Sequence, residues 1–264
     1  MKIRIRFVKK GSMQYIGHLD LMRYFQKLFR RSGFDVSYSK GFNPHQLMSF
    51  ASPLGLGITT VADYLDVSLE SFKVTGLTGN ELSGEVLSVE EWIKRINSHS
   101  NDMVLVTGIY ILEDTAKTSM SLLTAASYVI TGIDEKTCRD IVDYYNNNEQ
   151  IMFEKQTKKS VKEINLKEGI LALSYGFNAY DEAAEDFSVR DRAYERDNAE
   201  FDDGLYIFCL SGSETNIKPD MILESYHNHI SPDTAFDKYA FDIMRTDMFY
   251  GTKKYISMSV VSGE

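Results

Sequence analysis

The sequence predicts an α+β protein built from two tandem ferredoxin-like (split βαβ) modules, at residues 1–115 and 119–264, with an acidic insertion in the second at 180–204. Two observations lead to this prediction. Short segments that alternate apolar and polar residues are separated by segments whose apolar residues recur at helical spacing. The order strand, helix, strand, strand, helix, strand then occurs twice along the 264 residues, a length sufficient for two small domains.

The first module is expected to run as a strand at 2–8, a helix at 18–31, short strands at 36–38, 47–51 and 64–69, a helix at 88–96 and a strand at 104–112. Residues 2–8 alternate Ile and Phe with Arg, as a half-buried strand does. Gly33 stands where a helix C-cap belongs. Ser88 and Glu91 have the spacing of a capping box, which places a helix start there.

The second module is expected to run as a strand at 128–133, a helix at 134–145, a hairpin of 151–155 and 161–165, strands at 170–177 and 205–210, and a helix at 220–229. The tail 239–264 mixes strand and helix patterns and is left unassigned. Between the last two strands, residues 180–204 hold ten acidic residues against three arginines and few apolar anchors. This composition predicts an exposed insertion with at most a short helix.

Composition excludes several classes of protein. Two widely separated cysteines, Cys138 and Cys209, cannot form a disulfide framework, a zinc ribbon or an iron–sulfur cluster within this chain. No stretch approaches the apolar length of a membrane span, and the first residues have the pattern of a strand rather than a signal peptide. His227 and His229 point to different faces of a helix, so no metal site is predicted there.

Positive charge is concentrated at the start of the chain. Residues 1–46 hold ten basic and two acidic residues, a net charge of +8, whereas the remaining 218 residues carry −17. Such an asymmetry is typical of a surface that binds a polyanion, although a basic surface that only keeps the protein soluble has the same composition.

The helix at 18–31 places Arg23, Lys27 and Arg30 at i, i+4 and i+7, with Arg31 beside them. Cationic groups in one row can follow a phosphate backbone, and each contact weakens as salt rises. The same pattern also fits the ordinary solvent-exposed face of an amphipathic helix.

The loop that follows contains residues suited to nucleic-acid recognition. Beside Lys40, Phe42 can stack on a base, Asn43 can hydrogen-bond to a base edge, and His45 can act as an acid or base. The alternative interpretation is a common Asn-Pro turn with Phe42 as part of the core.

Three segments together resemble a bacterial domain family of unknown function, the radical-SAM-linked proteins. In that family the pattern reads roughly ISHLDLMR, GFNPHPKISFA and PLG, and this chain has YIGHLDLMR at 15–23, GFNPH at 41–45, SFA at 49–51 and PLG at 53–55. Weaker similarities extend over most of the chain. One difference is Gln46, where the family usually has proline, and it is expected to loosen the loop.

The resemblance implies a bacterial, cytoplasmic accessory protein that acts on RNA or a ribosomal component with a cobalamin-type radical SAM enzyme. This chain lacks the Cys-x₃-Cys-x₂-Cys motif, so the radical SAM protein is expected to be a separate chain, with no cofactor in this one. We expect an RNA- or ribonucleoprotein-binding module without catalytic activity of its own.

Two alternatives remain open. One is a metal-independent endoribonuclease that uses His18 and His45 as general acid and base, by analogy of fold with CRISPR-repeat-processing enzymes. The other is a protein–protein adaptor whose acidic insertion binds a basic partner.

Overall fold

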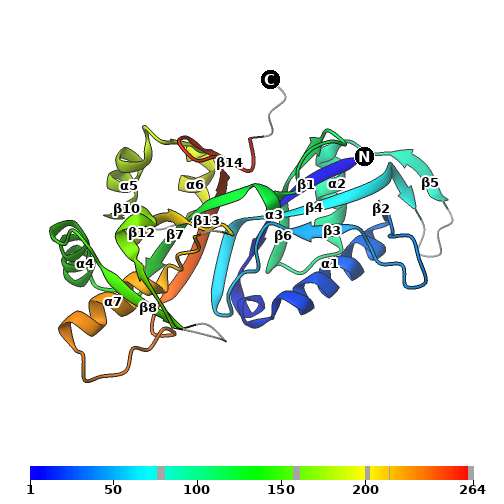
Figure 1. The fold of residues 1–264 in the computed structure, drawn as a ribbon. Coiled ribbons are helices and arrows are strands. Elements are labelled where there is room, and N and C mark those ends of the chain that lie inside the picture. Colours follow the sequence, from blue (N-terminus) through cyan, green and yellow to red (C-terminus); the bar gives the residue numbers. More distant parts are fainter. Residues whose placement is uncertain (76–80, 157–160, 200–202, 214, 261–264) are drawn as a thin grey trace. The chain divides into compact units, whose positions relative to one another are not determined.

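The computed structural model describes residues 1–75, 81–156, 161–199, 203–213 and 215–260. It has a mixed α+β fold with mostly antiparallel strand pairing. The chain forms two compact units (Figure 1). The first comprises Met1–Leu123 and Met258–Glu264, of which 258–260 are described at the C-terminal end, and the second comprises Thr124–Ser257.

The elements of the first unit are, in order, β1 (Lys2–Lys9), η1 (Gly11–Tyr15), α1 (His18–Ser32), β2 (Phe34–Val36), β3 (Met48–Phe50), β4 (Ile58–Thr75), β5 (Glu81–Val86), α2 (Val89–Ser98), β6 (Val104–Leu112) and α3 (Ser119–Leu122). Strand β1 lies between β4 and β6 and is antiparallel to both. In Figure 1 these three strands are blue, cyan and green. The short strands β2, β3 and β5 all pair with β4.

Helices α1 and α2 pack on the same face of this sheet. Alternate residues of β1, starting with Ile3, are buried in one core with Phe25 of α1 and Trp92 of α2. The indole Nε1 of Trp92 donates to the Phe72 carbonyl at 3.2 Å, which satisfies its one polar group. A continuous apolar core therefore holds α1 in place on the sheet.

The end of α1 depends on Gly33. This residue has φ 70°, in the left-handed region that glycine tolerates best. An added Cβ would lie 2.4 Å from the carbonyl oxygen of Thr75, so no larger residue fits without a backbone shift. The predicted C-cap is confirmed.

The second unit contains β7 (Leu123–Thr131), α4 (Glu135–Asn147), β8 (Met152–Gln156), β9 (Val161–Asn165), η2 (Leu166–Glu168), β10 (Ile170–Tyr175), α5 (Phe177–Ala184), β11 (Ser188–Val189), α6 (Arg192–Ala199), β12 (Leu205–Leu210), α7 (Asp220–Ile230), β13 (Asp242–Tyr250) and β14 (Tyr255–Ser257). The first residue of β7, Leu123, belongs to the first unit, and the rest of the strand belongs to the second. The main strands lie in the order β10, β12, β7, β13, and β8 forms a separate hairpin with β9. An aromatic core of Phe177, Tyr180, Tyr206, Phe208 and Phe249 packs on this sheet.

Several elements differ from the sequence prediction. Strand β4 is much longer than the predicted segment 64–69, because its C-terminal part pairs with the short strands β2 and β5 and its N-terminal part pairs with the end of β1. The unassigned tail supplies β13 and β14, and β13 is part of the second unit's sheet.

Candidate nucleic-acid interface

Helix α1 carries a row of exposed basic side chains. Its apolar side is buried in the core, and its opposite side exposes four residues, here named the α1 basic row: Arg23, Lys27, Arg30 and Arg31. The side chains of Lys27 and Arg30 make no hydrogen bond or ion pair with any residue that the structure describes. These two charges are therefore available to an external anion.

The other two members of the row have weak partners. Arg23 pairs with Asp20 at 3.1 Å, but both side chains are exposed, and such pairs contribute little. Arg31 donates from Nη2 to the His99 carbonyl at 3.1 Å, a contact that orients the guanidinium without neutralising it. The row retains most of its positive charge.

The loop 37–47 leaves the sheet between β2 and β3. Three backbone hydrogen bonds fasten its base: Ser37 N–H to the Ser68 carbonyl at 2.8 Å, Ser68 N–H to the Leu47 carbonyl at 2.9 Å, and Leu47 N–H to the Ser37 carbonyl at 2.8 Å. Because both ends of the loop bind the same residue of β4, the position of the loop is set by the sheet.

A second set of contacts narrows the loop above its base. Tyr38 pairs with Gln46 as an isolated bridge, and Ser39 N–H donates to the His45 carbonyl at 2.8 Å. Gln46 is buried, and its Nε2 donates to the Tyr38 hydroxyl at 3.3 Å. Glutamine at this position therefore joins the two sides of the loop, and the expectation that it loosens the loop relative to proline stays a prediction.

Phe42 lies within this fastened loop with its ring fully in solvent, at 106% relative exposure. Its neighbours Lys40 and Asn43 are exposed as well. The alternative interpretation of Phe42 as part of the core is therefore wrong. A phenyl ring, an amide and an ammonium group are all presented to solvent by one loop.

The two candidate histidines have different surroundings. His45 is exposed, and its Nδ1 is 2.8 Å from the Ser39 hydroxyl. His18 is partly buried at the start of α1, with its ring edge-on to Phe50 at 5.2 Å between centroids. In the part of the chain that the structure describes, no hydrogen bond or ring contact joins His18 to His45.

Three of the ten basic residues counted in residues 1–46 are not on the surface. Arg4, Arg6 and Lys9 of β1 are buried. Arg4 pairs with Asp66 of β4 at 2.8 Å and also donates to the Met258 carbonyl. The charge count of the N-terminal segment therefore overstates its basic surface, which is the α1 basic row with Lys10, Lys40 and the half-buried Lys2.

The histidines of α7 bind neighbouring protein groups. The Nε2 of His227 lies 3.0 Å from the Thr234 hydroxyl, and the ring of His229 packs on Tyr144 at 5.0 Å. Among the described residues, no group of three or more His, Cys, Asp and Glu side chains is arranged to hold a metal ion.

The acidic stretch 180–204 holds more regular structure than the single short helix expected, in its described part, which ends at 199 and resumes at 203. It forms most of α5, all of β11 and all of α6, and Tyr180 and Glu195 are buried. The expectation of at most a short helix was wrong because Tyr180 and Ala184, four positions apart, are buried on one side of α5, and because one buried arginine binds acidic side chains of both helices.

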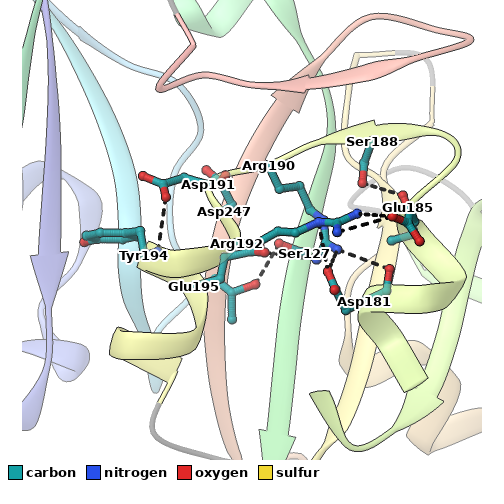
Figure 2. A network of polar contacts seen from close by, with 12 residues as sticks. Ser127, Asp181, Glu185, Ser188, Arg190, Asp191, Arg192, Tyr194, Glu195 and Asp247 are labelled. Carbon is teal, nitrogen blue, oxygen red and sulfur yellow. Dashed lines mark hydrogen bonds and ion pairs between the residues drawn. The ribbon is translucent and has the colours of Figure 1, made fainter. Parts of the chain in front are cut away.

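That arginine is Arg190; its side chain is fully buried, and its contacts are drawn in Figure 2. It forms ion pairs with Asp181 of α5 and with Glu195 of α6, the latter at 3.0 Å. Its guanidinium also lies 4.8 Å from the centroid of the Tyr180 ring. A single cation therefore ties two helices to the aromatic core of the second unit.

Glu195 is held in an unusual environment for a carboxyl group. Burial raises its pKa to about 8, the nearby carboxylates of Asp247, Asp181 and Asp191 reinforce the rise, and Arg190 opposes it. Its Oε1 has no hydrogen-bond partner among the described residues. Nothing in the sequence around Glu195 distinguishes it from its exposed acidic neighbours.

Comparisons with known proteins place the chain in a family. No helix within the described ranges has the length and apolar character needed to cross a membrane. No curated protein matches the chain. A family model described as "Uncharacterized protein conserved in bacteria (DUF2344)" matches residues 2–219, a range that holds the α1 basic row, the loop 37–47 and Arg190 with its partners Asp181 and Glu195. The chain therefore belongs to the bacterial DUF2344 family.

Proposed function

We propose that the protein is an RNA- or ribonucleoprotein-binding module. In this proposal the α1 basic row contacts phosphates, Phe42 stacks on an unpaired base, and Asn43 hydrogen-bonds to a base edge. The observation that carries it is the fully exposed ring of Phe42 on a loop whose base is fastened to β4.

The physical argument favours single-stranded RNA. Stacking on an aromatic side chain requires a base that is free of its own helix, and it tolerates any base because each has a π face. The unneutralised charges of Lys27 and Arg30 add an attraction that depends on salt and not on sequence. Together these groups favour a flexible polyanion with exposed bases.

We propose further that the module acts with a radical SAM enzyme in a separate chain. What supports this is the resemblance of residues 15–55 to radical-SAM-linked proteins. Cys138 and Cys209 are both buried and lack the spacing of a cluster motif. Any radical chemistry would therefore be supplied by the partner.

We infer also that each unit follows the split βαβ plan. In the first unit the strand order is β6, β1, β4, with β2 and β3 paired to β4, and in the second it is β13, β7, β12, β10. These two orders correspond strand for strand. The hairpin of β8 with β9 and the segment from α5 to α6 would then be insertions in the second copy.

The test reverses two charges of the row and measures RNA binding. Arg23→Glu with Arg30→Glu is expected to weaken filter binding of a single-stranded RNA by more than about tenfold. It is also expected to reduce the slope of log K against log salt by about 1.4 between roughly 50 and 200 mM, since each lost phosphate contact accounts for about 0.7.

The matched control is Lys73→Glu with Lys94→Glu, which changes net charge equally at two exposed sites outside α1 and the loop. The control is expected to bind as the parent does. Equal affinity of the Arg23/Arg30 variant and the parent at every salt concentration would refute the proposal. Incubation of the protein with the same RNA in the presence of EDTA is expected to leave the RNA intact. Cleavage that is abolished by His45→Ala would favour the endoribonuclease instead.

A further inference from the structure

A pocket of about 250 Å³ lies in the first unit, beside the base of the loop 37–47 and without any residue of the α1 basic row in its lining. Ile3 of β1 faces the helices, so Lys2 beside it faces the other side of the sheet. Lys2 is directly opposite Ser68 of β4 and Leu112 of β6, and all three line the pocket. The pocket is therefore built on the sheet face that points away from α1 and α2.

Two further segments complete the wall. Ser49 of β3 stands opposite Asp66 of β4, and both line the pocket. Residues 116–118, which lead into α3, form another side, and Leu47 at the base of the loop contributes an apolar part. The volume is slightly below the usual range for ligand sites, roughly 300–1,000 Å³, which restricts the occupant to a small molecule.

The charges in the pocket favour an anion. Lys2 and Lys117 are the two basic residues of the lining; the first donates only to the Ala116 carbonyl at 3.3 Å, and the second has no partner among the described residues. Asp66 presents no free negative charge, because Arg4 binds it at 2.8 Å and the Ser119 N–H donates to it at 2.5 Å. The net charge of the lining is therefore positive.

Hydroxyl and apolar groups complete the site. The side-chain hydroxyls of Ser49 and Ser68 have no hydrogen-bond partner in the described part of the chain, so both can donate to an anion. Leu47, Leu112 and Ala116 offer apolar surface beside them. This combination suits a molecule with an anionic head and a small apolar body.

We propose that this pocket binds a small amphipathic anion, with Lys2, Lys117 and the two serine hydroxyls around its charged group and Leu47 and Leu112 against its apolar part. The proposal does not depend on RNA binding: its charged groups, Lys2 and Lys117, lie outside the α1 basic row, and Leu47 and Ser68 join the base of the loop 37–47 through backbone groups.

The experiment titrates the full chain with phenyl phosphate and follows backbone amide chemical shifts. Saturable binding is expected, with the largest shifts at Ser49, Ser68 and Lys117. Benzyl alcohol, a neutral probe of similar size, and inorganic phosphate, which lacks the ring, are each expected to bind at least about tenfold more weakly. Equal binding of either probe, or shifts centred elsewhere, would overturn the proposal.

Variants of the lining provide the second readout. Lys2→Gln with Lys117→Gln is expected to weaken phenyl phosphate binding about tenfold or more, because charge-assisted hydrogen bonds are the strong ones in such a site. The control Lys73→Gln with Lys94→Gln removes the same charge outside the pocket and is expected to bind normally. Ser68→Leu, which fills the pocket, is expected to abolish binding of every probe. Each variant is first checked for a native amide spectrum, and normal binding by the folded Lys2/Lys117 variant would contradict the assignment.

Discussion

At the scale of single residues, exposure separates the groups available for binding from those that stabilise the fold. The sequence places arginines at positions 4, 6, 23 and 30, and nothing in their identity distinguishes them. In the structure Arg4 and Arg6 are buried in β1, whereas Arg23 and Arg30 are in solvent. Side-chain environment, which the sequence does not report directly, therefore decides which charges can meet a polyanion.

Phe42→Ala is the residue-scale prediction for RNA binding. Base stacking on an aromatic ring is worth about 1–3 kcal/mol, so affinity for single-stranded RNA is expected to fall about 5- to 150-fold. The unfolding midpoint is expected to stay unchanged, because the ring is already in water. Filter binding and thermal unfolding measure the two quantities. Phe42→Tyr, which keeps the ring, is expected to bind normally, and unaltered affinity in Phe42→Ala would remove stacking from the mechanism.

Glu195 gives a residue-scale prediction on pH. A glutamate in the unfolded chain titrates near pH 4.3, whereas burial raises the folded pKa to about 8. Between these values the folded protein binds one more proton than the unfolded chain, so this group lowers the free energy of unfolding as pH rises from about 5 to 8. The slope is at most about 1.4 kcal/mol per pH unit.

Glu195→Gln removes that dependence. Relative to the parent, the variant is expected to gain stability progressively from pH 5 to pH 8 in urea unfolding experiments. Glu185→Gln, which changes an exposed carboxyl of the same acidic stretch, is the control and is expected to follow the parent. Parallel stability profiles for the parent and Glu195→Gln would contradict the raised pKa.

At the scale of elements, the sequence predicted the helices and helix caps that are stabilised by residues close together in the chain. The amphipathic helix α1 and its cap at Gly33 follow from apolar spacing and one glycine. The capping box of α2 is confirmed, with Ser88 N–H bound to Glu91 at 2.8 Å and Glu91 N–H to the Ser88 hydroxyl at 3.3 Å. These features depend on residues within four positions of each other, which a sequence displays directly.

Elements that depend on distant partners were missed. The full length of β4 is set by its pairing with several other strands. Helices α5 and α6 are joined by the buried Arg190, whose acidic partners lie nine residues before it and five residues after it, beyond the range of a cap. For the candidate interface, the spacing of the α1 basic row was predicted, but the exposure of Phe42 was left open because the sequence allowed a core position equally.

Ser88→Ala is the element-scale prediction. Loss of the cap is expected to lower the free energy of unfolding by about 1 kcal/mol, since two backbone N–H groups at the start of α2 lose this reciprocal arrangement. Urea unfolding measures the change. Ser98→Ala removes a hydroxyl at the other end of α2 and is expected to have a much smaller effect. An equal loss in both variants would show that the capping box contributes nothing specific.

At the scale of the whole molecule, the family match and the compact units do not end at the same place. The matched range stops at residue 219, whereas the second unit continues through α7 and β13 to Ser257. Met221 and Leu223 of α7 are buried, as are Met248 and Phe249 of β13. The unit therefore needs residues that lie beyond the matched range.

A chain truncated after Pro219 is expected to lose the native structure of the second unit. Removing β13 exposes one edge of β7, and removing α7 uncovers apolar surface. Near-ultraviolet circular dichroism should lose much of its tyrosine signal, and the truncated chain should aggregate. A soluble truncated chain whose spectrum keeps the second unit's contribution would contradict this expectation.

The buried indole of Trp92 has a practical consequence for all of these measurements. It is the chain's one tryptophan, and it lies in the core of the first unit against Phe34. Selectively excited indole fluorescence therefore follows the loss of that core alone, while tyrosine signals follow both units. The protein thus carries an intrinsic optical reporter that can resolve the melting of its two halves without any label.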